Sequence, residues 1–161
     1  AACTHRSEGF VSRSIKEYDL SFSSSDSYPS FEELGCHSDV DCDWEDYDEA
    51  LENKSYELET ERHKLLGYAN LVQGEMLTEC ERTARGLYCG NAESYQKTSK
   101  DAKKDINKAS TDWVLLFQLA SIQDDDYELM FGDLGNLYFC IRKQDLKERN
   151  FDKVWLVLQC G

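Results

Sequence analysis

Three short apolar runs in the last third of the chain constrain the fold more than any other feature of the sequence. They lie at residues 113–117, 137–141 and 154–158, with a shorter run at 129–131. Each run is too short for a buried helix and rich in β-branched or aromatic residues, so we predict strands that are buried on both faces. The segment 132–136 between two of these strands is typical of a hairpin loop in which Gly135 and Asn136 adopt positive φ.

The rest of the sequence predicts helices around these strands. Ser30 and Glu33 have the spacing of a capping box, in which each side chain accepts the backbone amide of the other residue. Apolar residues at helical or near-helical spacing predict helices or helical turns over 43–62, 75–85, 96–109 and 143–148. The alternation of apolar and polar residues from Tyr18 to Phe22 predicts a half-buried strand. The predicted fold class is therefore α+β, with a mixed or antiparallel sheet and peripheral helices.

Negative charge is concentrated in one part of the chain. The formal net charge is −14, and residues 39–61 contain eleven acidic residues against Lys54 alone. Such a field repels nucleic-acid backbones and anionic membranes, so we expect neither as a partner. It suits a basic partner or a cation, although a solvated acidic helix face that aids solubility is the commoner explanation of such a segment.

The same acidic segment contains a partial calcium-loop pattern. The carboxylates with loop spacing are Asp41, Asp43, Glu45, Glu49 and Glu52. Asp46 stands where the sharp turn of such a loop requires glycine, so we predict only weak, diffuse calcium attraction.

The cysteines predict a reducing environment. The chain contains seven cysteines and no C-x-x-C pair, and Cys140 and Cys160 lie in or beside apolar strands. We therefore expect free thiols and a cytoplasmic location. No set of four zinc ligands and no glycine-rich phosphate loop is present in the sequence, so we predict no metal and no cofactor. No apolar run approaches the ~20 residues of a membrane span, so no membrane association is expected.

The sequence assigns no catalytic residue. None of the histidines stands in a known catalytic signature. His63 and Asp133, both in glycine-containing loops, could act as acid and base in a hydrolase-like enzyme, although structural hydrogen bonds are the commoner outcome. In that structural alternative, His63 caps a backbone carbonyl and Asp133 accepts amides of the 132–136 turn.

We predict that these two loops border any binding groove, including one for a small molecule. The candidate groove residues are His63, Tyr68, Gln73, Asp133 and Gln159. Gln118 and Gln159 each end an apolar run that begins near a tryptophan, which hints at a small internal duplication. Since buried polar groups are normally paired, such glutamines usually satisfy neighbouring backbone groups.

Six segments of the chain together resemble the YwqG-like family, whose function is unknown. The segments are 63–68, 73–76, 86–90, 112–118, 130–139 and 154–160. The resemblance covers residues 30–161, which correspond to the C-terminal portion of the family domain, and leaves 1–29 as an irregular segment with one strand. It implies an α+β fold with a substantial sheet and implies no reaction.

The sequence thus favours a non-enzymatic binding or scaffold module with an acidic surface. Its expected partner is a protein, for which the acidic surface suits a basic one, or the remaining N-terminal portion of the family domain supplied by another chain.

Overall fold

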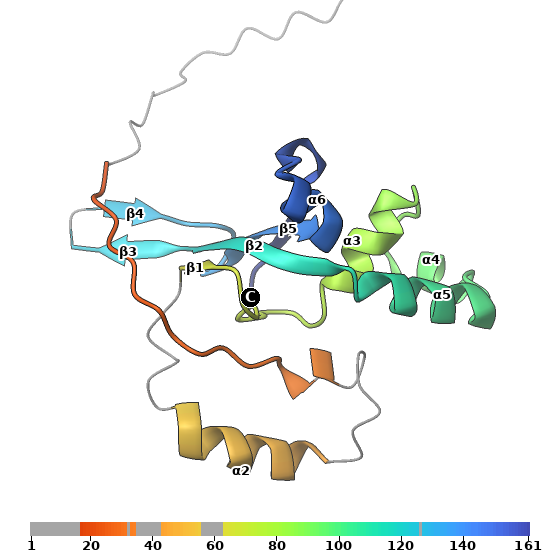
Figure 1. Ribbon diagram of the computed structural model, residues 1–161, viewed down its shortest axis with the longest axis horizontal. Helices are drawn as coiled ribbons and strands as arrows, with labels where there is room; N and C mark the ends of the chain where they lie inside the picture. The colour runs from red at the N-terminus through yellow and green to blue at the C-terminus, as the bar shows by residue number, and fades with distance from the viewer. Residues whose placement is uncertain (1–16, 32, 35–42, 56–62, 126) are drawn as a thin grey trace, which may run out of the picture.

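The computed structural model describes most of the chain and is drawn in Figure 1. The described residues are 17–31, 33–34, 43–55, 63–125 and 127–161.

The predicted antiparallel sheet is present and organises the fold. It has four strands in the order β1-β2-β5-β6, and each neighbouring pair is antiparallel. The strands are β1 (Lys64–Leu65), β2 (Trp113–Ala120), β5 (Asn136–Arg142) and β6 (Trp155–Gln159). The three long apolar runs are therefore strands β2, β5 and β6, and the α+β class with an antiparallel sheet is confirmed.

A small hairpin extends from the end of β2. It consists of β3 (Ile122–Asp124) and β4 (Tyr127–Leu129), which form a separate two-stranded sheet. Since β4 pairs with β3 and β5 returns to β2, the segment 132–136 does not form a β-hairpin, and that prediction was wrong.

The positive φ angles of that segment were also assigned to the wrong residues. They occur at Gly132 (φ 64) and Leu134 (φ 50), whereas Asn136 is already the first residue of β5. At Gly132 a Cβ atom would lie 2.6 Å from the side chain of Cys160, so both the backbone angle and the lack of space require glycine.

Each predicted helix is present over most of its described residues, although the one expected from residue 96 begins only at Lys100. They are α2 (Trp44–Ser55), α3 (Leu77–Ala84), α5 (Lys100–Ser110) and α6 (Lys143–Glu148), with the short α4 (Ala92–Gln96) and the 3-10 turn η2 (Phe151–Lys153) in addition. The end of the predicted 43–62 helix, at 56–62, lies outside the described residues. Figure 1 shows α2 on one side of the sheet and α6 on the other.

The N-terminal segment is less regular than its sequence pattern predicts. The strand expected from Tyr18 to Phe22 is absent, and Phe22 is 74% exposed. Tyr18 makes a ring contact with Tyr127 on β4, and the segment does not pair with a neighbouring strand. The capping box is confirmed: the Ser30 amide donates to Glu33 Oε2 (3.1 Å), and the Glu33 amide donates to Ser30 Oγ (3.2 Å).

The core lies on one face of the sheet, which we call the inner face. Its buried residues are Ala69, Met76, Cys80, Trp113, Leu115, Tyr138, Cys140 and Val157. Alternate residues of β2, β5 and β6 supply the sheet side of this core, and the loop before α3, together with α3, covers it.

Candidate binding surfaces

His63 and Tyr68, two of the predicted groove residues, flank the short strand β1. His63 Nδ1 accepts the backbone amide of Ala120 (3.2 Å), at the end of β2. Nδ1 of His63 therefore binds a backbone amide, and the capping of a backbone carbonyl by this side chain stays a prediction. Tyr68 is exposed, and its backbone amide donates to Ser27 Oγ (3.1 Å).

Gln73 lies in the loop before α3, and Gln159 at the end of β6 forms hydrogen bonds with that loop. Gln159 Oε1 accepts the amides of Val72 (3.0 Å) and Gln73 (3.1 Å), and Gln159 Nε2 donates to the Gly74 carbonyl (2.9 Å). Gln73 Nε2 donates to the Cys160 carbonyl (2.6 Å). These bonds fasten the loop before α3 onto the end of β6.

Gln118 on β2 forms a similar set of hydrogen bonds with the same loop. Its Oε1 accepts the Asn70 amide (2.9 Å), and its Nε2 donates to Asn70 Oδ1 (3.1 Å). The Asn70 carbonyl accepts from Tyr138 Oη (2.6 Å) and from the side chain of Asn136 (3.1 Å). The prediction that Gln118 and Gln159 satisfy backbone groups is confirmed.

Asp133 does not hold its turn in the predicted way. Its carboxylate makes no hydrogen bond with any residue that the structure describes, while its backbone carbonyl accepts the Gly161 amide (3.1 Å). Ser121 holds the turn instead: its Oγ donates to the Gly135 carbonyl (2.8 Å) and accepts the Phe131 amide (3.0 Å). A buried hydroxyl beyond the end of β2 thus replaces the predicted carboxylate.

Four of the five predicted residues are linked to one end of the sheet, namely His63, Gln73, Asp133 and Gln159. The backbone amide of Tyr68 is bonded to Ser27 instead. Ala120 pairs with Asn136, and Asn136 pairs with Gln159, so these three residues form one row across the sheet. His63 bonds to Ala120 at one end of this row, and Asp133 lies in the turn that leads into Asn136. The hydrogen bonds among these residues maintain the fold, and a groove between the two loops stays a prediction.

The second face of the sheet, which we call the outer face, is apolar and incompletely covered. Cross-strand pairing aligns two rows on it: Leu65, Phe117, Phe139 and Leu156 in one, and Leu119, Leu137 and Leu158 in the other. Phe117 and Phe139 stack with their ring centroids 5.8 Å apart. Leu156 and Leu158 are each 52% exposed, so the prediction of strands buried on both faces was wrong for β6.

Strand β6 also forms an edge of the sheet. It pairs with β5 on one side, and no described strand pairs with its other side. Proteins usually protect such edges with charged residues, prolines or bulges. The sequence of β6, from Trp155 to Gln159, contains no charged residue and no proline.

A buried ion cluster centred on Glu81 joins α3 to the sheet. Glu81 accepts from Trp113 Nε1 (2.9 Å), Arg85 Nε (2.6 Å) and Arg142 Nη2 (2.5 Å). Burial alone would raise the pKa of Glu81, but the hydrogen bonds from Trp113 and Arg85 and the charge of Arg142 outweigh burial and hold this pKa below its ordinary value. Sequence reasoning missed this cluster, because nothing in the helical pattern marks an inward-pointing glutamate.

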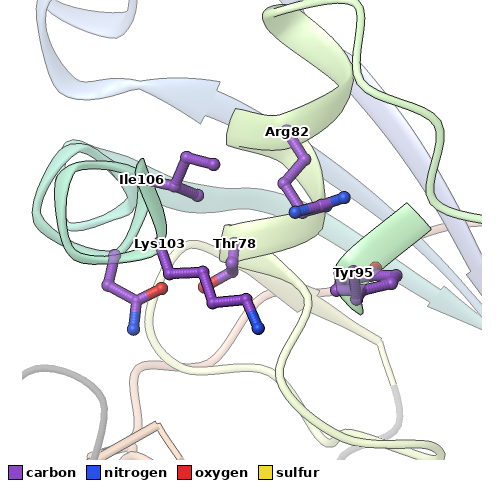
Figure 2. Close-up of a pocket in the computed structure, with 6 residues that line it drawn as sticks. Thr78, Arg82, Tyr95, Lys103 and Ile106 are labelled. Atoms are coloured by element: carbon purple, nitrogen blue, oxygen red, sulfur yellow. The ribbon is translucent and has the colours of Figure 1, made fainter. Parts of the chain in front are cut away.

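A cavity of about 210 Å³ opens between α3, α4 and α5 (Figure 2). Its lining residues are Thr78, Arg82, Tyr95, Lys103, Ile106 and Asn107. The guanidinium of Arg82 lies 4.0 Å from the ring centroid of Tyr95. Burial, together with a hydrogen bond to Cys89, raises the pKa of Tyr95 to about 12, so its phenol is neutral at pH 7.

The acidic helix α2 exposes its carboxylates to solvent. The exposed acidic residues are Asp43, Glu45, Asp46, Asp48 and Glu49. Asp43 Oδ1 accepts the Asp46 amide (2.9 Å), which is the bond of a helix N-cap. Of the residues in the calcium-loop pattern, Asp41 lies outside the described part of the chain, and the calcium prediction stays untested.

The described cysteines carry free thiols at Cys80, Cys89, Cys140 and Cys160. Within the described ranges, no group of three or more potential metal ligands occurs. The helices of this part of the chain are all too short or too polar to cross a membrane.

These features define a small α+β protein with an antiparallel sheet, one packed face and one half-exposed apolar face. The chain belongs to the family described as a domain of unknown function (DUF1963), which matches residues 5–160. No curated protein matches the chain. The resemblance to YwqG-like proteins, the restriction to a C-terminal portion and the domain boundary at residue 30 stay predictions.

Proposed function

We propose that this chain is a non-enzymatic protein-binding module that accepts an extended segment of a partner along the edge of β6. The observation that carries the proposal is the combination of an uncharged edge, to which no described strand is paired, with the exposed Leu156 and Leu158 on it. An exposed edge offers backbone donors and acceptors to an added strand.

An added strand would continue the two apolar rows of the outer face. Its side chains alternate between the faces, so every second residue would lie next to Leu156 or Leu158. Burying one such leucine contributes about 1–2 kcal/mol, since roughly half of each side chain is still available. Two leucines and several backbone hydrogen bonds suit a moderate, reversible affinity.

The negative charge of the chain favours a positively charged partner. A net charge of −14 attracts a basic partner and steers its approach, with the acidic segment 39–61 as the main source. Two copies of this chain repel each other by the same field. We therefore propose a basic partner segment with alternating apolar residues rather than a second copy.

The hydrolase-like alternative has less support. The Nδ1 atom of His63 is occupied by the Ala120 amide, and among the described residues no hydrogen bond joins the Asp133 carboxylate to His63. A proton-transfer pair needs both side chains directed at a common reacting atom.

The test starts from a random peptide library selected on the immobilised chain. We expect enrichment of extended, basic peptides with alternating apolar residues. A synthetic copy of the best peptide should bind, and the double variant Leu156→Lys/Leu158→Lys should weaken this binding at least about tenfold. Since both leucines are half exposed, the variant should retain the thermal unfolding midpoint of the wild type.

The matched control is Leu87→Lys, which adds a charge at an exposed leucine after α3 and should leave binding unchanged. Enriched peptides that bind the double variant as well as the wild type would contradict the proposal. So would a dimer, detected by sedimentation, that the double variant abolishes, because the edge would then bind a second copy.

A further inference from the structure

We propose that the cavity between α3, α4 and α5 is a binding site for a small oxyanion, a carboxylate or a phosphate, which Arg82 and Lys103 bind. This inference is independent of strand binding at β6. No sequence motif points to it, because its residues come from three separate helices.

Arg82 is a buried cation without a counter-ion among the described residues. Arg82 is 2% exposed, and none of the described ion pairs includes it. It donates to Thr98 Oγ1 (3.1 Å), the Ser94 carbonyl (3.3 Å) and the Tyr88 carbonyl (3.4 Å), all uncharged acceptors. Its Nε has no hydrogen-bond partner among the described residues.

An uncompensated buried charge is costly, and an anion in the cavity would relieve that cost. The neighbouring acidic cluster does not compensate Arg82, because Glu81 is taken by Arg85 and Arg142. Three uncharged acceptors and the ring of Tyr95 orient the guanidinium, and no described carboxylate forms an ion pair with it.

A second cation lines the same cavity. Figure 2 shows Lys103 of α5 and Arg82 of α3 extending toward a common space, with Thr78 between them and Tyr95 alongside. The region from Lys97 to Lys108 contains five lysines and two aspartates, in a chain that is otherwise strongly acidic. The lining itself contains two cations and no carboxylate, which favours an anion in this cavity.

The lining and size of the cavity restrict the ligand. Arg82 supplies a planar donor group suited to an oxyanion, Lys103 a mobile point charge, and Thr78 a hydroxyl. The volume of about 210 Å³ is below the range of drug-sized ligand sites. A compact anion therefore fits better than an extended one.

The experiment titrates the full chain with sodium phosphate, and separately with sodium acetate, in a sodium chloride background of fixed ionic strength. The arginine Nε–Hε resonance of Arg82 is followed by NMR. We expect a saturable shift with at least one of the two anions, and the responding anion tells the phosphate class from the carboxylate class. Lys103→Gln should weaken this binding roughly fivefold, since one charge-assisted contact is lost.

Lys104→Gln provides the matched control, because Lys104 is an exposed neighbour on α5 that does not line the cavity. It removes the same charge and should leave the affinity nearly unchanged. The proposal fails if neither anion gives a saturable shift at Arg82, or if Lys103→Gln and Lys104→Gln weaken binding equally, which would indicate diffuse attraction only.

Discussion

At the scale of single residues, buried polar side chains define how this fold closes. Glu81 connects α3 to β2 and β5, and through Arg85 it reaches Asp105 on α5 (Arg85 Nη1 to Asp105 Oδ2, 2.5 Å). A buried carboxylate is stable only with such partners. Removal of the Glu81 charge should therefore lower the free energy of unfolding much more than the loss of a surface ion pair does.

We predict that Glu81→Gln destabilises the protein by about 3 kcal/mol at pH 7, because two arginines lose their common partner. The folded pKa of Glu81 is lowered, so its contribution is complete above the unfolded pKa of roughly 4 and is lost as the pH falls through the folded value. Urea unfolding of both proteins should show their difference shrinking below about pH 4. An unchanged difference at low pH would contradict this assignment.

The control for this prediction is Glu93→Gln. Glu93 forms an exposed ion pair with Lys97 (2.8 Å), in which both side chains are mostly accessible to solvent. Water screens such a pair, so its loss should change the unfolding free energy little at any pH.

At the scale of elements, the sequence predicts local structure and fails where distant segments meet. The strands β2, β5 and β6 could be predicted because each is a continuous apolar run. The order β1-β2-β5-β6 depends on contacts between residues far apart in the chain, which no local pattern contains. The glutamines were correctly interpreted because each ends a predicted buried strand, where a polar side chain needs a partner. The cavity around Arg82 was missed because its lining residues come from three separate helices.

A β-bulge in β2 explains why Trp113 and Gln118 lie on the same face of the sheet. Trp113 and Gln118 are five residues apart and would lie on opposite faces of a regular strand. The register of β2 shifts between Leu115 and Phe117, which returns Gln118 to the inner face beside Tyr138. In β6 the four-residue spacing from Trp155 to Gln159 reaches the same face without a bulge.

We predict that Gln159→Leu destabilises the protein by about 2 kcal/mol, because two loop amides and the Gly74 carbonyl lose their partner. Partial access of water to the loop keeps the loss moderate. Urea unfolding gives the magnitude, and limited proteolysis should show faster cleavage within residues 70–76. Gln123→Leu, at an exposed position of β3, is the control, and equal stability of the two variants would refute the anchoring role of Gln159.

At the scale of the whole molecule, the two faces of the sheet differ in how they are covered. The inner face is closed by the loop before α3 and by α3 itself, which buries Tyr138, Cys140 and Val157. The outer face is partly open, and its most exposed residues lie on the edge strands β1 and β6. The apolar runs predict strands buried on both faces, but they do not determine which elements cover which face.

This asymmetry predicts a gradient of amide hydrogen exchange across the sheet. Strand β5 pairs with β2 on one side and β6 on the other, so its amides should exchange most slowly. Those β6 amides that point away from β5 have no described strand partner and should exchange close to the rate of exposed loops. Exchange followed by NMR residue by residue tests this directly, with the exposed segment 17–26 as the fast reference. Addition of the selected peptide should then slow the outward amides of β6 and leave α2 unchanged. Outward β6 amides that exchange as slowly as β5 in the isolated chain would show that the edge is already closed, and an added strand would have no place to bind.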